Sequence, residues 1–307
     1  MAAQKVIIVT GANCGIGLET AIGLCEKGHD VVISTRDDTK GEAAVAEIKA
    51  KVPDACVMYI PMELSEPESI REFVHRFMET GKPLHVLVNN AGLFKQYRSP
   101  ERSSARNNEA LEITMTVNCM GTFLLTNLLL DKLKETATEA NQARIVNVSS
   151  GITTLAANKT KGFFIDDIML VGEGNYESGL QSYRNSKLAL NMWSRKLAED
   201  LAGTNVMINC VCPGFIPNTG LARENLTNTS SRFFIWLLDT FVGRFFMNTQ
   251  PVSKGRERLI RMAVGEDITT TGRFYYADNP VEEAEEVLDE RNMEKIWNLC
   301  VEFSGLH

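Results

Sequence analysis

A glycine-rich turn between a short apolar run and a helical pattern constrains the fold of this chain more than any other feature. Residues 5–9 (KVIIV) are apolar and rich in β-branched side chains, which is typical of a strand buried on both faces. The turn 10–17 (TGANCGIG) follows, and apolar residues then recur at helical spacing until Gly28. Glycines here let the backbone approach a pyrophosphate, whose charge is bound by N–H groups at the helix N-terminus. The turn therefore predicts a phosphate site, with a plain strand-to-helix connection as the alternative.

Apolar runs and helical patterns alternate as far as residue 214. Five more short apolar runs lie at 31–34, 57–60, 86–88, 144–148 and 206–211. Because helical segments separate them, the sequence predicts the α/β class, with a Rossmann-type doubly wound parallel sheet. A chain of 307 residues with 44% hydrophobic content can bury such a core in a single domain. We place this domain at 1–276 and predict an acidic, amphipathic helical tail at 277–307.

Composition and charge argue against several classes of protein. A net charge of −7, without a run of lysines or arginines, disfavours nucleic acid as a partner. The seven cysteines are scattered and the four histidines lie far apart, so neither a disulfide framework nor a metal site is indicated. The first predicted strand starts close to Met1, which would leave no room for a targeting peptide or a membrane anchor. We therefore expect a cytoplasmic protein without a transmembrane segment.

The end of the second predicted strand carries residues that distinguish NADP from NAD. In dinucleotide folds an acidic residue here binds the 2′-hydroxyl of NAD, whereas an arginine suits the 2′-phosphate of NADP. Thr35 lies eighteen residues after Gly17, about where the acidic residue would stand, and Arg36 follows it. We therefore predict NADP (NADPH). NAD is the less favoured cofactor, and it stays open because Asp37 could also contact a ribose.

Tyr183 and Lys187 lie four residues apart in a predicted helix, so both side chains share one face. A phenol titrates near pH 10, too high for ready proton exchange at neutral pH. A neighbouring ammonium favours the phenolate and lowers that pKa. The pair therefore suits proton exchange with an alcohol or carbonyl oxygen; an ordinary surface pair is the alternative.

Other polar residues stand where strands end. Residues 89–92 (NNAG) follow the fourth predicted strand, and Ser149 and Ser150 follow the fifth. Ligands of an open parallel sheet bind outside the carboxyl ends of its strands, so we expect these residues in one crevice. Asn118 lies among apolar residues inside a predicted helix at 109–134, where asparagine is locally unfavourable. A helix–helix hydrogen bond is the alternative to a role in the crevice.

Five features stand in one order along the chain: TGANCGIG at 10–17, NNAG at 89–92, Asn118, VSS at 148–150 and YRNSK at 183–187. In this the sequence resembles the short-chain dehydrogenase/reductase family from about residue 4 to 276. Within the family it resembles the branch of retinol dehydrogenases and WW domain-containing oxidoreductase. The features that carry this are TRDDTKGE at 35–42, SKLALNMW at 186–193 and the C-terminal 272–306. PGFIPNTGL at 213–221 is similar to light-dependent protochlorophyllide reductases.

The resemblance implies four catalytic residues. Tyr183 would be the general acid/base, and Ser150, rather than Ser149, would hold the substrate oxygen by a hydrogen bond. Lys187 would lower the pKa of Tyr183 and bind the nicotinamide ribose. Asn118 would bind a water that links Lys187 to solvent.

It also implies a cofactor site. The residues of this site are Thr10, Gly11, Asn13, Cys14, Gly15, Ile16, Gly17, Arg36, Glu63, Leu64, Asn90, Ala91, Gly92, Tyr183, Lys187, Pro213 and Gly214. Two positions depart from the family pattern. Glu63 stands where aspartate is usual, and Asn218 stands where threonine is frequent.

Residues 232–247 (RFFIWLLDTFVGRFFM) gather many aromatic side chains between Pro213-Gly214 and the last helical patterns. We interpret this stretch as part of a substrate lid at about 215–250. Core packing, a homo-oligomer contact and a peripheral membrane contact remain alternatives. The predicted function is NADP-dependent oxidoreduction of a bulky apolar carbonyl or alcohol, such as a retinoid, steroid, lipid aldehyde or xenobiotic ketone. The alternative is a non-catalytic dinucleotide-binding sensor or scaffold.

Overall fold

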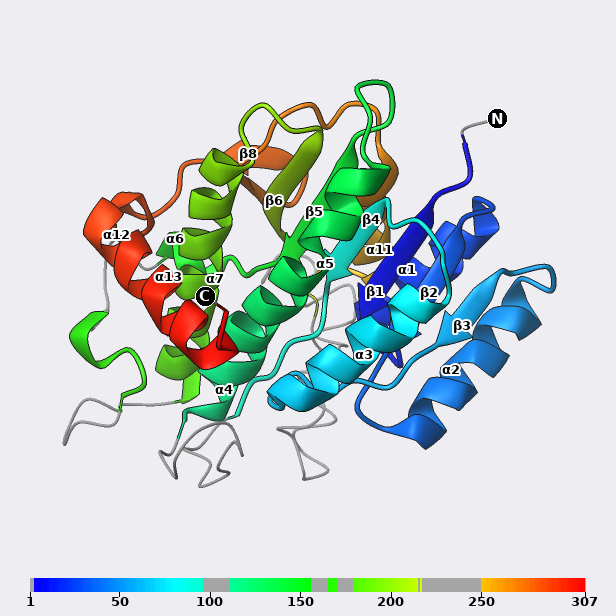
Figure 1. Ribbon diagram of the computed structural model, residues 1–307, viewed down its shortest axis with the longest axis horizontal. Helices are drawn as coiled ribbons and strands as arrows, with labels where there is room; N and C mark the ends of the chain where they lie inside the picture. The colour runs from blue at the N-terminus through cyan, green and yellow to red at the C-terminus, as the bar shows by residue number, and fades with distance from the viewer. Residues whose placement is uncertain are drawn as a thin grey trace.

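The computed structural model describes residues 3–95, 111–155, 165–170, 179–214, 216 and 250–306. They form one eight-stranded sheet with helices on both faces (Figure 1). The strands are β1 (Val6–Thr10), β2 (Asp30–Ser34), β3 (Val57–Tyr59), β4 (Val86–Asn89), β5 (Ala143–Val148), β6 (Val206–Cys212), β7 (Arg273–Tyr276) and β8 (Asn279–Val281). The main helices are α1 (Gly15–Glu26), α2 (Asp38–Lys51), α3 (Pro67–Glu79), α5 (Thr122–Thr136), α7 (Gly179–Asp200), α11 (Val252–Val264) and α13 (Glu290–Ser304). The shorter ones are α4 (Ile113–Met115), the π-helix η1 (Thr116–Gly121), α6 (Ile152–Leu155), the 3-10 helix η3 (Ile165–Asp167) and α12 (Glu285–Leu288).

The strand order is β3-β2-β1-β4-β5-β6-β7-β8, and all pairs except β7–β8 are parallel. β1 lies between β2 and β4, so the chain reverses its direction across the sheet at the carboxyl end of β1. The predicted α/β class and doubly wound sheet are confirmed. The hairpin of β7 and β8 extends the sheet beyond the six predicted strands, and β8 lies within the segment 277–307.

Alternation along each strand divides the core into two layers, because successive side chains point to opposite faces. Ile8 of β1 packs in the layer that holds Phe73 of α3 and Trp193 of α7. Its neighbour Ile7 packs on the other face, with Ile22 of α1 among its layer. Helices α3, α5, α7 and α13 therefore cover one face, and α1, α2 and α11 cover the other (Figure 1).

The predicted helix at 109–134 is interrupted at the position of Asn118. The chain forms α4, then the π-helix η1 and then α5 instead of one continuous α-helix. The segment Ile113–Thr136 is long and apolar enough to span a membrane by composition: an 18-residue window within it has a mean hydropathy of 1.5, but 78% of that window is buried inside the domain. We interpret it as a core helix.

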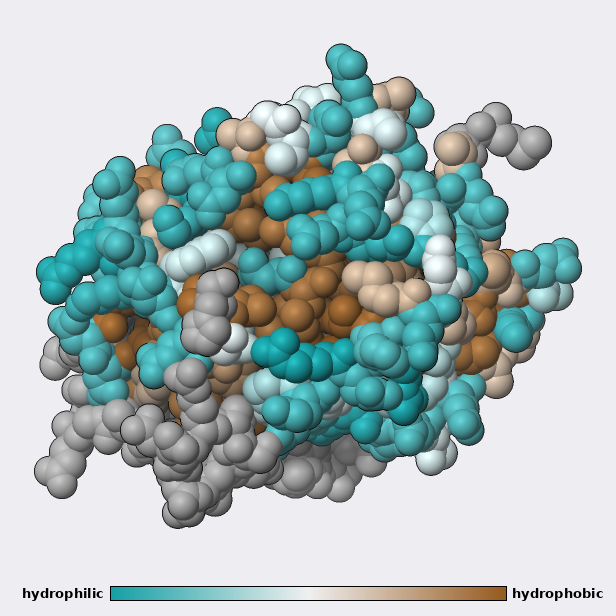
Figure 2. All heavy atoms as spheres, in the orientation of Figure 1, coloured by the Kyte–Doolittle hydropathy of each residue, from teal (hydrophilic) through white to brown (hydrophobic). Residues whose placement is uncertain are grey.

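The C-terminal helix α13 lies against α5, α7 and η1 (Figure 1). The ring of Trp297 meets the edge of Phe123 at a centroid distance of 5.0 Å, and Phe123 also contacts Trp193 at 5.6 Å. The thiols of Cys300 and Cys119 lie 3.7 Å apart. Hydrophobic residues remain exposed near the middle of this face, and hydrophilic residues surround them (Figure 2).

Candidate active site

The glycine turn packs closely against the residues that follow β4. Gly11 and Gly15 have φ values of +64° and +59°, a region that favours glycine. A Cβ at Gly11 would lie 2.8 Å from the Ala91 Cα. The amide of Asn90 donates to the carbonyl of Thr10 at 2.8 Å, which ties the two strand ends together. The predicted cofactor residues of 10–17 and 90–92 are thus neighbours at the N-terminus of α1, where backbone N–H groups attract anions.

The carboxylates near this turn serve the protein's own backbone. Asp37 caps α2: its Oδ1 accepts the N–H of Lys40 at 3.0 Å, and this hydrogen bond lowers the pKa of Asp37. Glu63 folds back so that its Oε1 accepts the N–H of Ser65 at 3.1 Å. Arg36 is exposed at the end of β2, next to the buried Thr35.

Asn118 joins the loop after β4 to α7. Its Oδ1 accepts the N–H of Leu93 at 2.7 Å, and its Nδ2 donates to the Leu93 carbonyl at 2.8 Å and to Ser186 Oγ at 3.0 Å. Both hydrogens of the amide are therefore used within the protein. The structure gives the Asn118 side chain a positioning role, and a water bound to its Nδ2 would need one of these bonds to break.

Tyr183 meets Ser150 at the carboxyl end of β5. A hydrogen bond joins the two side chains and acts to lower the pKa of Tyr183. Ser149, in contrast, is buried beside it, and its main-chain N–H donates to the carbonyl of Val211 on β6. Ser150 is thus the serine that reaches the phenol. The sequence-based preference for Ser150 agrees with this geometry.

Lys187 lies one turn further along α7 and is only 3% exposed. Its Nζ donates to the carbonyl of Val148 at 2.8 Å and lies 5.8 Å from the ring centroid of Tyr183. The position of Gly92 keeps a side chain away from this ammonium, because a Cβ there would lie 3.6 Å from Nζ. Two of the three N–H bonds of the ammonium therefore remain for partners other than Val148.

The protonation of this pair differs from the sequence-based expectation that Lys187 lowers the pKa of Tyr183. Burial raises the pKa of Tyr183 to about 12, and the hydrogen bond from Ser150 only opposes this. Burial also lowers the pKa of Lys187 to about 8. The low-polarity surroundings disfavour both charges more strongly than the charges favour each other at this separation. Tyr183 is consequently a protonated phenol at neutral pH.

The loop after β6 is braced by a residue that the sequence did not indicate. Arg258 of α11 donates to the carbonyl of Pro213 at 2.7 Å. Gly214 has a φ of +97°, and a Cβ there would lie 2.8 Å from the Arg258 guanidinium. No local pattern links Arg258 to residues 45 positions away. The predicted lid at 215–250 lies, apart from Ile216 and Gln250, outside the described residues, as does Asn218.

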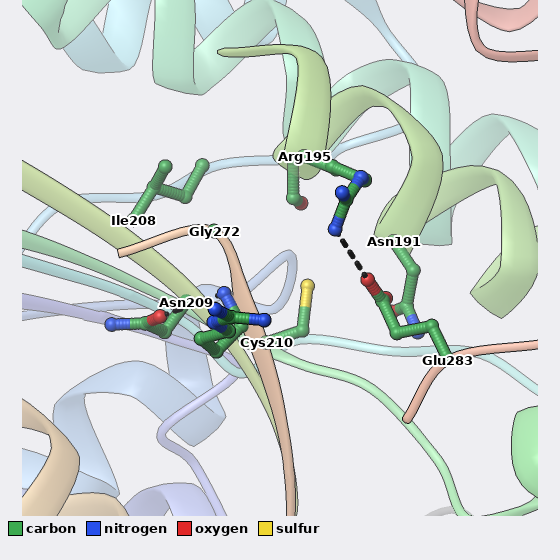
Figure 3. A pocket seen from close by; sticks show the side chains of 9 residues that line it. Asn191, Arg195, Ile208, Asn209, Cys210, Gly272 and Glu283 are labelled. Atoms are coloured by element: carbon green, nitrogen blue, oxygen red, sulfur yellow. Dashed lines mark hydrogen bonds and ion pairs between the residues drawn. The ribbon is translucent and has the colours of Figure 1, made fainter. Parts of the chain in front are cut away.

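A small hollow is lined by Asn191, Ser194 and Arg195 of α7, two or more helical turns after Tyr183, and by residues of β6 and β7 (Figure 3). Its empty volume is about 160 Å³, which is less than a dinucleotide site requires. Within it, Arg195 of α7 lies 3.7 Å from the carboxylate of Glu283, which follows β8 (Figure 3). This hollow is not the cofactor site.

Comparisons with known proteins agree with this geometry. The family model for short chain dehydrogenase matches residues 5–161 and 171–229. Retinol dehydrogenase 12 of Mus musculus is 35% identical over 303 residues, which cover 98% of this chain and 87% of that protein. Retinol dehydrogenase 11 of Homo sapiens is 34% identical, with 98% and 86% covered. Short-chain dehydrogenase TIC 32 A, chloroplastic, of Brassica napus is 31% identical, with 96% and 87% covered.

Solved structures give the same result for the fold. The Pseudomonas aeruginosa RhlG/NADP active-site complex matches with a TM-score of 0.66 and 26% identity, over 90% of this chain and 96% of that one. YwfH, an NADPH dependent reductase involved in Bacilysin biosynthesis, matches with a TM-score of 0.67 over 90% and 97%, and at 20% identity it supports the fold alone. The sheet order, the glycine turn and these matches together assign the protein to a family. The chain belongs to the short-chain dehydrogenase family, a family of oxidoreductases, and to its retinol dehydrogenase-like branch.

Proposed function

We propose that this protein is an NADP(H)-dependent oxidoreductase that reduces a bulky apolar ketone or aldehyde, with Tyr183 as the general acid. The observation that carries the proposal is the arrangement of Ser150, Tyr183 and Lys187. The phenol is hydrogen-bonded to Ser150, and Lys187 lies beneath it at the carboxyl end of the sheet. Such a triad can bind a carbonyl oxygen and protonate it.

The residues present fit a dinucleotide. The turn 10–17 offers bare backbone at a helix N-terminus, and Gly92 places no side chain against the buried ammonium of Lys187. Bound nicotinamide would supply the hydride for the carbonyl carbon. Lys187, which spends one N–H on Val148, would bind the ribose hydroxyls with the others.

Side chains of the protein would bind and protonate the carbonyl oxygen of the substrate. Ser150 would donate a hydrogen bond to the carbonyl oxygen and so hold it within reach of the phenol. Tyr183 would then give its proton to that oxygen as negative charge develops on it. The pKa of Tyr183, about 12, keeps the proton on the phenol at neutral pH, so the phenol is in the protonated form that a general acid needs. Lys187 would stabilise the resulting phenolate by its positive charge.

Two observations support NADP over NAD. Asp37 is the residue that could have contacted the ribose of NAD. Its carboxylate instead caps α2 and forms an ion pair with Lys40 at 3.4 Å. Arg36 stands exposed beside it with a guanidinium suited to a phosphate. In addition to these two observations on the chain itself, the similar RhlG structure is an NADP active-site complex. An apolar carbonyl is in turn supported by the retinol dehydrogenase relatives.

The test is the turnover of NADPH with a panel of carbonyls: retinaldehyde, a steroid ketone, a long-chain aldehyde and an aromatic ketone. We expect oxidation of NADPH by one apolar class, and a loss of roughly 10²–10⁴-fold in kcat for Tyr183→Phe. Tyr275→Phe is the matched control. Tyr275 lies on β7, and its hydroxyl is hydrogen-bonded to Thr270 at 2.8 Å instead of to a residue of the candidate site. Full turnover by Tyr183→Phe would disprove the mechanism. Tight NADPH binding without any turnover would favour the dinucleotide sensor instead.

A further inference from the structure

Phe94 is the residue whose ring touches the phenol of Tyr183. The two ring centroids lie 5.6 Å apart and the planes meet at 76°, an edge-to-face arrangement. Aromatic pairs of this geometry attract each other beyond the effect of the area they bury. Phe94 is half-buried and lies two residues after Gly92, in the loop that leaves β4. The short motif at 89–92 ends before it, so the sequence pattern did not single it out.

The backbone in front of Phe94 is fixed to the helix that carries Tyr183. Asn118 binds both backbone polar groups of Leu93, at 2.7 and 2.8 Å, and also donates to Ser186. Ser186 in turn donates to the carbonyl of Tyr183 at 2.7 Å. A closed circuit of contacts therefore runs from Tyr183 through Ser186, Asn118 and the loop back to the ring of Tyr183.

These contacts restrain rotation of the Tyr183 side chain, and this rotation sets where the hydroxyl lies for proton transfer. α7 fixes the Cα of Tyr183, but rotation about its side-chain bonds could still move the hydroxyl away from Ser150. Lys187 lies 5.8 Å from the ring centroid and donates to a backbone carbonyl, so it does not clamp the ring edge. The Phe94 ring supplies that lateral contact.

We propose that Phe94 is a positioning residue that holds the phenol of Tyr183 toward the substrate oxygen and presents an apolar surface beside it. The proposal rests on the proposed function for its effect on turnover. It does not depend on that function for its effect on the Tyr183 ring. A displacement of about 1 Å at a reacting group can cost roughly 100-fold in rate, so a lateral contact of this kind matters.

The kinetic test compares Phe94→Ala with Phe94→Tyr, which keeps a ring, and with Met78→Ala, an exposed apolar truncation on α3. We expect Phe94→Ala to lower kcat roughly tenfold or more while KM for NADPH stays unchanged. The pH at which kcat falls in alkali should move to a lower value, because the phenol loses an apolar neighbour and burial then raises its pKa less. Phe94→Tyr should restore both, and Met78→Ala should change neither. Wild-type kcat and pH profile in Phe94→Ala would overturn the proposal.

A second measurement separates this proposal from the proposed function. In protein labelled with 3-fluorotyrosine, the ¹⁹F signal of Tyr183 is identified by its loss in Tyr183→Phe. We expect Phe94→Ala to shift this signal and Phe94→Tyr to return it. A shift in a protein without turnover would support the contact while counting against the proposed function. An unshifted signal would overturn the proposal whatever the kinetics. If Phe94→Ala does not fold, Phe94→Leu gives the same comparison, since it removes the ring and keeps the apolar volume.

Discussion

Asp37 and Glu63 show how single carboxylates at strand ends can serve the chain instead of a ligand. Asp37 accepts the N–H of Lys40 and begins α2, and Glu63 accepts the N–H of Ser65. An N-terminal cap of this kind contributes about 1 kcal/mol to a helix, so a move of the Asp37 carboxylate toward a ribose would carry that cost. Arg36, one residue earlier, is exposed and carries the guanidinium on which the proposed preference for NADP rests.

Replacing Arg36 with alanine should therefore weaken NADPH far more than NADH. A hydrogen bond to a charged group contributes about 1.5–3 kcal/mol, which corresponds to a Kd for NADPH that is roughly 10- to 100-fold higher. The Kd for NADH should change little, because NADH has no 2′-phosphate. Isothermal titration of both cofactors measures this, with Lys51→Ala, at the far end of α2, as the matched loss of a cation. Equal weakening of both cofactors would contradict the preference for NADP.

Among the elements, the π-helix η1 and the C-terminal helix α13 depend on each other. η1 lies close to the chain after β3, because Gly121 has no Cβ to collide with the carbonyl of Leu64. On its other side α13 packs over η1 and α5 through Trp297 and Cys300. Since η1 carries Asn118, α13 supports the candidate site although none of its residues enters it.

Truncation of Trp297 should loosen this contact. Its ring meets Phe123 edge-on at 5.0 Å, and Lys196 Nζ lies 5.5 Å from its centroid. The ring is half-buried, so for Trp297→Ala we expect a loss of at least about 2 kcal/mol in the free energy of unfolding. Urea denaturation followed by circular dichroism measures this. Trp297→Phe, which keeps an aromatic edge contact, should lose less; an equal loss would mean that ring geometry is irrelevant here.

At the scale of the whole molecule, Glu283 couples folding to pH. It follows β8 and faces Arg195 and Asn191 of α7, Cys210 of β6 and Arg273 of β7. Burial raises its pKa to about 7, although Arg195 and Arg273 act to lower it. The burial effect is the larger one because the carboxylate is only 7% exposed and lies 3.7 Å from the nearer guanidinium, so the ion pair is loose.

The sign of the pH dependence follows from this. An unfolded glutamate loses its proton near pH 4.3, whereas in the folded protein Glu283 keeps it until about pH 7. The folded state thus binds more protons in this window, so the stability due to Glu283 falls as pH rises from about 4.5 to 7, by up to about 3 kcal/mol. Glu283→Gln should remove this fall. Thermal unfolding of both proteins between pH 5 and 8 tests it, with exposed Glu282→Gln as control.

Other groups titrate in the same range, so the comparison with wild type is the informative quantity. His29 and His85 accept the N–H groups of Lys5 and Val6, and burial lowers their pKa values. Their contribution to stability is lost as pH falls, opposite to that of Glu283, and it is common to both proteins. If the stabilities of Glu283→Gln and wild type differ by the same amount at pH 5 and at pH 8, the buried carboxyl does not titrate as described.

The sequence alone determined those features whose physical basis is local. A buried strand shows as a continuous apolar run, and a turn at a helix N-terminus needs its glycines within a few residues. The Tyr183–Lys187 pair follows from helical periodicity. These patterns predicted the doubly wound sheet, and they led us to expect Ser150, Tyr183, Lys187 and the glycine turn at the carboxyl ends of its strands.

Only the tertiary structure decided what depends on contacts between distant segments. The helix around Asn118 contains a π-helix, and the amide of Asn118 reaches Leu93 and Ser186, 25 and 68 residues away. Phe94 met Tyr183, and Arg258 met Pro213, through packing that no spacing encodes. The pKa of Tyr183 rose where the sequence predicted a fall. Proximity of a charge can be inferred from sequence, but the exclusion of water that disfavours charge is set by everything packed around it.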